Sequence, residues 1–112
     1  MKLVEKISIK ELKEMSSKMF GNLVKAVVDI ELNKVVVDAG LHSDEEQLLL
    51  SQGSNQSDLW GINIYPDKSK KDRIEFDSMI NIKPRDDNMT RSVKNKEFQK
   101  KILQIMDKVI VE

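Results

Sequence analysis

The 112-residue sequence contains no cysteine and only one histidine. The absence of cysteine excludes disulfides, thiol nucleophiles and thiolate-bound zinc, and it favours a reducing compartment, the cytoplasm. A single histidine excludes every site that needs two of them. No apolar run approaches the ~20 residues of a membrane span, and residues 1–10 lack the apolar centre of a signal peptide. The sequence therefore predicts a cytoplasmic protein with no membrane segment.

Charge of neither sign dominates, because 19 Lys and Arg residues balance 19 Asp and Glu residues. The net charge gives no reason to expect nucleic acid or an anionic membrane as a partner. The charges are unevenly distributed, since residues 29–67 carry eight acids against one base and residues 68–101 carry eleven bases against six acids. Nucleic-acid association through the basic half is therefore kept as a third and weaker hypothesis. With 39% hydrophobic residues, the chain suits one globular domain over residues 1–112.

Local patterns predict three helices. Ser8 with Glu11, and Ser43 with Glu46, fit the capping box, which predicts helices over residues 9–20 and 44–52. Asn95 is a favourable N-cap for a last helix, in which apolar residues recur at helical spacing from residue 98 to residue 109.

Runs rich in Val and Ile predict four strands that form two hairpins. The first hairpin is expected over residues 23–32 and 35–39, and the second over residues 59–65 and 74–83. Residues 1–7 form either a further short strand or an ordered arm. The predicted fold class is α+β, with a mostly antiparallel sheet of four to five strands and three helices packed mainly on one face.

The alternation of strand side chains predicts an acidic outer face on this sheet. In the first hairpin, a loop of two or four residues places Asp29 opposite Asp38. In the second, matching the apolar faces places Asn63 opposite Asp77 and Tyr65 opposite Glu75. Clustered carboxylates raise one another's pKa or recruit a divalent cation such as Mg²⁺, Mn²⁺ or Ca²⁺. One hypothesis is therefore a metal-assisted hydrolase, with Asp29, Asp38 and Asp77 as metal ligands and His42 as the catalytic base. The alternative is a charged sheet face that is simply solvated.

The favoured hypothesis is a small binding or interaction module. Asn63, Tyr65 and Glu75 face outward on the predicted sheet and would form its contact surface. The partner would be another protein or a second copy of the chain. Four apolar residues fall on the same polar face and would either form a dimer patch or be covered by the N-terminal arm or a loop. They are Leu23, Val27, Val36 and Met79.

Three segments give the chain a resemblance to a known family. The first is residues 21–30 and the third is residues 74–84. The second runs from Leu41-His42 to residue 66 and contains the sequence Asp58-Leu-Trp-Gly-Ile-Asn-Ile-Tyr-Pro66. In these segments the chain resembles a small prokaryotic family of about this length, which is a domain of unknown function. The resemblance covers nearly the whole chain. It implies a stand-alone domain and carries no activity or site residues with it.

Overall fold

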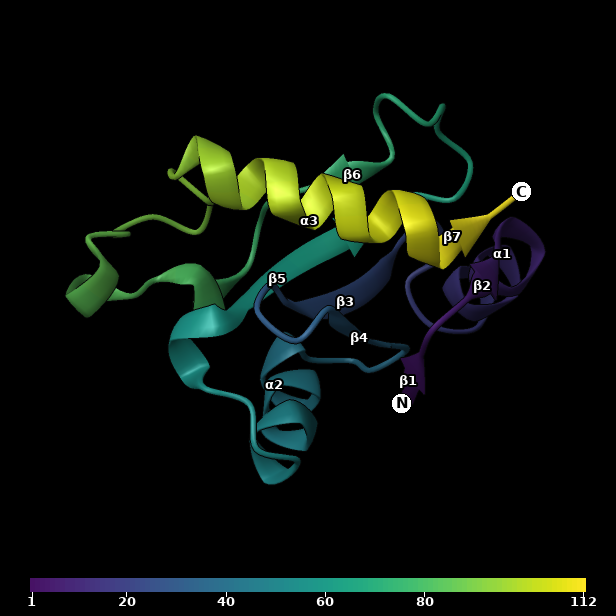
Figure 1. Ribbon diagram of the computed structural model, residues 1–112. Coiled ribbons are helices and arrows are strands. Elements are labelled where there is room, and N and C mark those ends of the chain that lie inside the picture. Colours follow the sequence, from purple (N-terminus) through teal and green to yellow (C-terminus); the bar gives the residue numbers. More distant parts are fainter.

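The computed structural model describes residues 1–112 and shows an α+β fold, as predicted (Figure 1). Its centre is a five-stranded sheet in the order β1-β4-β3-β5-β6, in which all neighbouring strands are antiparallel. A separate pair of short parallel strands, β2 and β7, joins the two ends of the chain. The strands are β1 (Lys2–Val4), β2 (Ile7–Ser8), β3 (Val24–Asp29), β4 (Lys34–Val37), β5 (Leu59–Ile64), β6 (Ile74–Glu75) and β7 (Ile110–Val111).

Three α-helices accompany the sheet: α1 (Ile9–Lys18), α2 (His42–Ser51) and α3 (Lys96–Val109). The first and last begin where their caps predict. The Ser8 hydroxyl accepts a hydrogen bond from the Glu11 amide at 3.1 Å, and the Asn95 side chain accepts from two amides of the first turn of α3. The second predicted capping box is wrong, because α2 begins at His42 and no side chain caps it. None of the helices is long and apolar enough to cross a bilayer.

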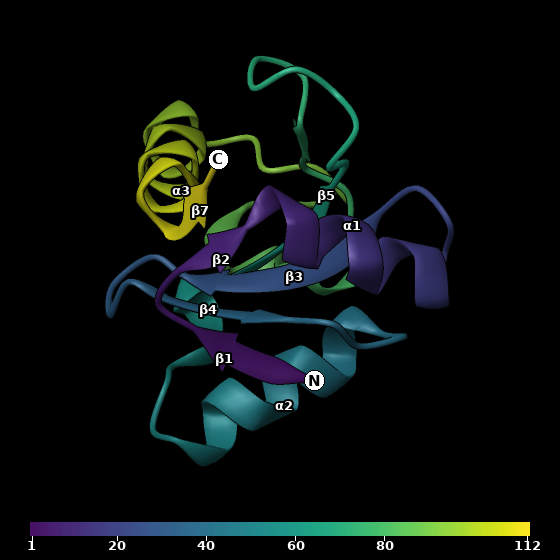
Figure 2. The ribbon, with the colours of Figure 1, turned by 90° about the vertical axis from the view of Figure 1, so that its right-hand side faces the viewer.

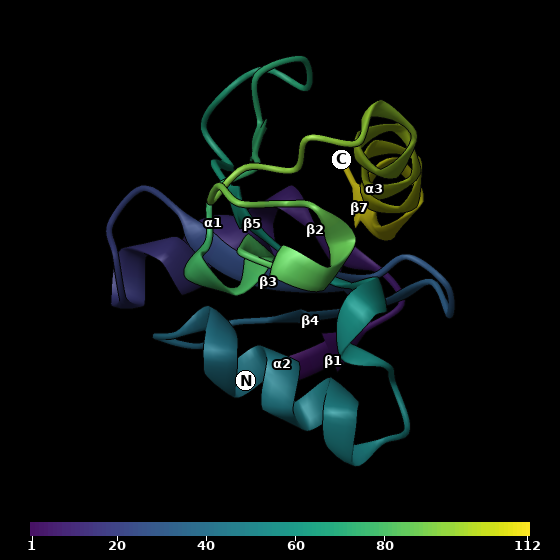
Figure 3. The same ribbon diagram turned by 90° about the vertical axis from the view of Figure 1, so that its left-hand side faces the viewer.

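The helices form layers on both sides of the sheet (Figures 2 and 3). Helices α1 and α3 lie on one face and contribute to a large apolar core with the even-numbered residues of β3, while α2 packs on the opposite face. There Leu49 of α2 covers Val27, Val36 and Leu59, and all four side chains are fully buried. The polar face is therefore not an open surface. Because α2 covers Val27 and Val36, these two residues cannot form a dimer patch. The cover is a helix and not the N-terminal arm or loop that was predicted.

The register of the first hairpin differs from the prediction by four residues. Asp29 lies opposite Lys34, not opposite Asp38, because the turn is formed by residues 30–33. The carboxylate of Asp29 accepts hydrogen bonds from the amides of Glu31 and Leu32, at 2.9 and 2.8 Å, and Asn33 completes the turn with a positive φ of 57°. Asp29 is thus a turn-forming residue, which the strand pattern alone does not reveal.

The second hairpin is shorter than predicted. Strand β6 contains only two residues, and Asn63 pairs with Glu75 rather than with Asp77. Beyond Glu75 the chain leaves the sheet, and the side chain of Asn81 takes the place of a neighbouring strand. Its amide accepts from the Gly61 N–H at 2.8 Å and donates to the Gly61 carbonyl at 3.0 Å. A side chain has thus replaced the expected backbone ladder.

Candidate functional site

The three residues predicted to form a contact surface do come together. Asn63 and Glu75 are paired across β5 and β6, and Tyr65 follows β5 directly. Oε1 of Glu75 accepts hydrogen bonds from Asn63 Nδ2 at 2.9 Å and from the Tyr65 hydroxyl at 3.0 Å. Partial burial and the Glu75 carboxylate raise the pKa of Tyr65, which keeps its hydroxyl a donor. The three side chains form one hydrogen-bonded unit, but Asn63 is buried rather than outward-facing and its Oδ1 has no hydrogen-bond partner.

His42 lies beside this unit, at the start of α2, and is only 8% exposed. Its Nε2 is 2.8 Å from the carbonyl oxygen of Ile62. Because a carbonyl oxygen only accepts, Nε2 carries the proton and, in the neutral ring, Nδ1 has none. Burial lowers the pKa of His42, and the hydrogen bond to the Ile62 carbonyl opposes this effect without cancelling it. The ring is therefore a neutral, buried link between α2 and β5, and little of it is open to a substrate.

The predicted metal ligands Asp29, Asp38 and Asp77 are not gathered into one site. Asp29 is completely buried and engaged by the turn amides and by the Ser54 hydroxyl. Asp38 follows β4 with a left-handed backbone, and Asp77 pairs with Arg91 at 2.7 Å. No group of three or more His, Asp or Glu side chains lies close enough to hold a metal ion. The expected convergence fails because it rested on the register that placed Asp29 opposite Asp38.

The buried position of Asp29 leads to a stability prediction. Asp29→Asn keeps one oxygen for the turn amides but replaces the oxygen that accepts from Ser54 at 2.6 Å. We expect the free energy of unfolding to fall by about 1.5–3 kcal/mol, the loss typical of one charge-assisted hydrogen bond. Urea denaturation measures this. Asp38→Asn is the control, because asparagine tolerates a positive φ, and it should change stability by less than about 0.5 kcal/mol. Equal losses in both variants would contradict the assigned role of Asp29.

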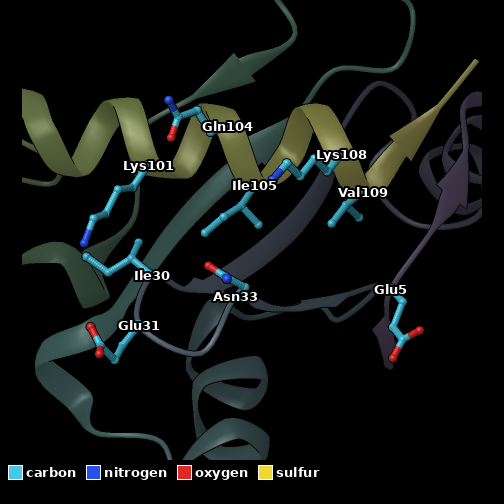
Figure 4. A pocket seen from close by; sticks show the side chains of 9 residues that line it. All are labelled: Glu5, Ile30, Glu31, Asn33, Lys101, Gln104, Ile105, Lys108 and Val109. Carbon is cyan, nitrogen blue, oxygen red and sulfur yellow. The ribbon is translucent and has the colours of Figure 1, made fainter.

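A groove lies on the other face of the sheet, the face that α3 covers. It has a volume of about 700 Å³ and runs between α3 and the turn that joins β3 to β4 (Figure 4). Its volume is within the usual range for ligand sites. Its apolar residues are Ile30, Ile105 and Val109, and its polar residues are Lys101, Gln104 and Lys108 from α3 and Glu5, Glu31 and Asn33 from the opposite side.

The two walls of this groove carry opposite charges. The α3 wall is basic, and the wall formed by the β3–β4 turn and the segment after β1 is acidic. In Figure 4, Lys101 and Glu31 lie toward one end of the groove, and Lys108 and Glu5 lie toward the other. None of these four side chains forms an ion pair, whereas the chain contains five ion pairs elsewhere. The groove thus presents unpaired charges of both signs beside a narrow apolar floor.

Reasoning from the sequence missed this groove, because Lys101 was assigned only to the basic half of the chain, residues 68–101. A weak signal was present in α3, where Lys101, Gln104 and Lys108 form a polar stripe at helical spacing beside the apolar stripe. The acidic wall gave no signal, because Glu5 and Glu31 are brought opposite α3 only by the tertiary fold.

The fold and the groove together define a small single-domain α+β protein with a charged cleft beside its C-terminal helix. The family described as "Protein of unknown function (DUF5674)" matches residues 1–109, and the chain belongs to it. No curated protein and no solved structure matches the chain.

Proposed function

We propose that this protein is a cytoplasmic binding module whose groove beside α3 holds a polypeptide segment of a partner protein. The observation that carries the proposal is the pair of oppositely charged walls, with all four charged side chains unpaired, on either side of an apolar floor. A fold that contains no cysteine suits the reducing cytoplasm. The surface used for binding is then this groove and not the Asn63–Tyr65–Glu75 unit, whose groups bond one another.

The walls favour a partner that carries charges of both signs. A purely anionic ligand would be attracted by Lys101 and Lys108 but repelled by Glu5 and Glu31, and a purely cationic ligand would meet the opposite conflict. Lys101 and Lys108 are seven residues apart, which on a helix corresponds to about 10 Å. In a helix this is the distance of two turns, and in an extended chain it lies between the ~7 Å and ~13 Å that separate side chains two and four residues apart on one face. A polypeptide supplies both charge signs and apolar side chains at this spacing.

The test uses three acetylated and amidated heptapeptides. In the first, leucine alternates with lysine and glutamate; in the second all charged positions are lysine, and in the third all are glutamate. We expect the mixed peptide to bind about three- to tenfold more tightly than either control, because exposed ion pairs contribute only about 0.2–1 kcal/mol each. Methyl NMR should show the shifts at Ile30, Ile105 and Val109.

Lys101→Glu makes one end of the groove acidic on both walls and should weaken binding of the mixed peptide. Lys96→Glu, on the same helix but outside the groove, is the matched control and should leave the affinity unchanged. Sedimentation at several protein concentrations examines a second copy as the occupant. The proposal is wrong if all three peptides bind alike, if the shifts fall elsewhere, or if the groove is filled by a second copy of the chain.

A further inference from the structure

A second groove lies on the other side of α3, between this helix and the segment that leads into β6. Its volume is about 410 Å³. Its apolar lining comes from Ile74, Leu103, Met106 and Ile110, and its cationic lining comes from Lys70, Lys71, Arg73 and Lys100. Gln104 and two acids, Asp107 and Glu112, complete the lining. With four cations against two acids, this groove has one dominant sign, unlike the groove in Figure 4.

Arg73 is the unusual member of this set, because it is only 8% exposed. Its Nη1 donates to Oε1 of Glu112 at 3.1 Å, and its Nε is buried without any hydrogen-bond partner. A guanidinium presents donors in a planar fork that matches both oxygens of a carboxylate or phosphate. Here that fork is only partly used, which leaves an unfilled donor on a buried cation.

Glu112, the acid that pairs with Arg73, is exposed and makes few polar contacts of its own. The side chain of Glu112 is 70% exposed, and this one contact to Arg73 is its only ion pair. Of the remaining cations, Lys70 pairs with Asp107 at 2.6 Å, whereas Lys71 and Lys100 have no acidic partner. Because water competes for the exposed Glu112 carboxylate, it can leave Arg73, and an anionic ligand in its place keeps the buried guanidinium paired. With Glu112 displaced, the groove offers such a ligand three cations.

We propose that this groove binds an organic anion with a short apolar body. The anionic head takes the place of the Glu112 carboxylate on Arg73 and is attracted by Lys71 and Lys100, while the apolar body lies against Leu103 and Met106. A carboxylate and a phosphate monoester share this chemistry, and the probes below distinguish them. The proposal does not depend on the groove in Figure 4, because the two sites share only Gln104 and all the charged residues that line them differ.

The experiment titrates the whole protein with octanoate, with hexyl phosphate, and with acetate and inorganic phosphate, which lack the apolar body. NMR follows the Arg73 Nε–H resonance and the methyl groups of Leu103 and Met106. We expect octanoate or hexyl phosphate to shift both sets of signals together and to saturate. The tighter of the two identifies the head group.

Glu112→Gln removes the competing carboxylate from an exposed position and should tighten binding of the better probe about two- to fivefold. Glu97→Gln makes the same chemical change in the first turn of α3, outside the groove, and should have no effect. The proposal is overturned if no probe saturates at millimolar concentration, if only the lysines respond, or if both variants change the affinity equally. Arg73→Lys keeps the charge but loses the fork, and should weaken binding if the protein remains folded.

Discussion

Gly61→Ala is expected to lower the free energy of unfolding by about 3 kcal/mol, as estimated for overpacking together with lost hydrogen bonds. A β-carbon at this position of β5 would lie 2.5 Å from the β-carbon of Ser78 and 2.6 Å from its hydroxyl oxygen. Ser78 is fully buried and its amide donates to the Arg91 carbonyl at 3.0 Å, so it has little freedom to withdraw. The side chain of Asn81, which binds both backbone groups of Gly61, would be displaced with it.

Gly40→Ala is the matched control for this prediction. No atom lies within 4 Å of a β-carbon added at Gly40, and its φ is not positive. Alanine there should leave stability unchanged or raise it by up to about 1 kcal/mol, because it restricts the unfolded chain. Urea denaturation of both variants measures the difference. If Gly61→Ala proved as stable as Gly40→Ala, the close approach of β5 to the segment around Ser78 would be wrong.

Glu45→Gln is expected to stabilise the protein at neutral and alkaline pH. Glu45 lies on the buried side of α2 and is completely buried, and only its Oε2 has a partner, the Ala39 amide at 3.2 Å. Burial raises the pKa of Glu45 from 4.5 to about 9, although the bond from Ala39 opposes the shift. The folded state therefore contains the neutral acid at pH 7, whereas the unfolded chain contains the carboxylate.

The sign of the pH dependence follows from the raised pKa. The stability that the neutral carboxyl contributes is fully present below pH 4.5 and is lost as the pH rises toward about 9. Glutamine cannot ionise, so the Glu45→Gln variant should be more stable than the parent by about 3 kcal/mol at pH 7. The two proteins should agree to within about 1 kcal/mol near pH 4.5, where the unfolded carboxyl is only half ionised.

Urea denaturation at several pH values between 4.5 and 9 measures this effect. Asp44→Asn, an exposed carboxylate in the first turn of the same helix, is the control and should show no comparable pH dependence. A Glu45→Gln variant whose stability followed that of the parent at every pH would contradict the buried, neutral state of Glu45.

The sequence predicted those parts of the fold that depend on local chemistry. Capping side chains at Ser8 and Asn95 located the starts of α1 and α3, and the alternation of apolar residues placed Val24, Ala26 and Val28 on the core side of β3. It did not predict the register, because a shift by an even number of residues keeps every side chain on its face. The register is instead fixed by the turn that Asp29 forms.

For the candidate sites, too, the sequence predicted what depends on local pattern and missed what depends on register and long-range packing. Asn63, Tyr65 and Glu75 were predicted together and are together, because they lie close in sequence on adjoining strands. The metal-site prediction required Asp29, Asp38 and Asp77 to converge, and this depended on the incorrect register. The groove in Figure 4 depends on how α3 lies across the sheet, which is a long-range packing result that periodicity does not contain.

The most direct test of the proposed function is an exchange of charge between the two walls of the groove. Lys101→Glu alone and Glu31→Lys alone should each weaken binding of the mixed heptapeptide, measured by isothermal titration calorimetry. The double variant again places an acid opposite a base at that end of the groove, with the polarity reversed, and should recover affinity beyond the sum of the two single effects. Strictly additive losses in the double variant would show that the two walls do not act on one ligand, and would contradict a polypeptide bound between them.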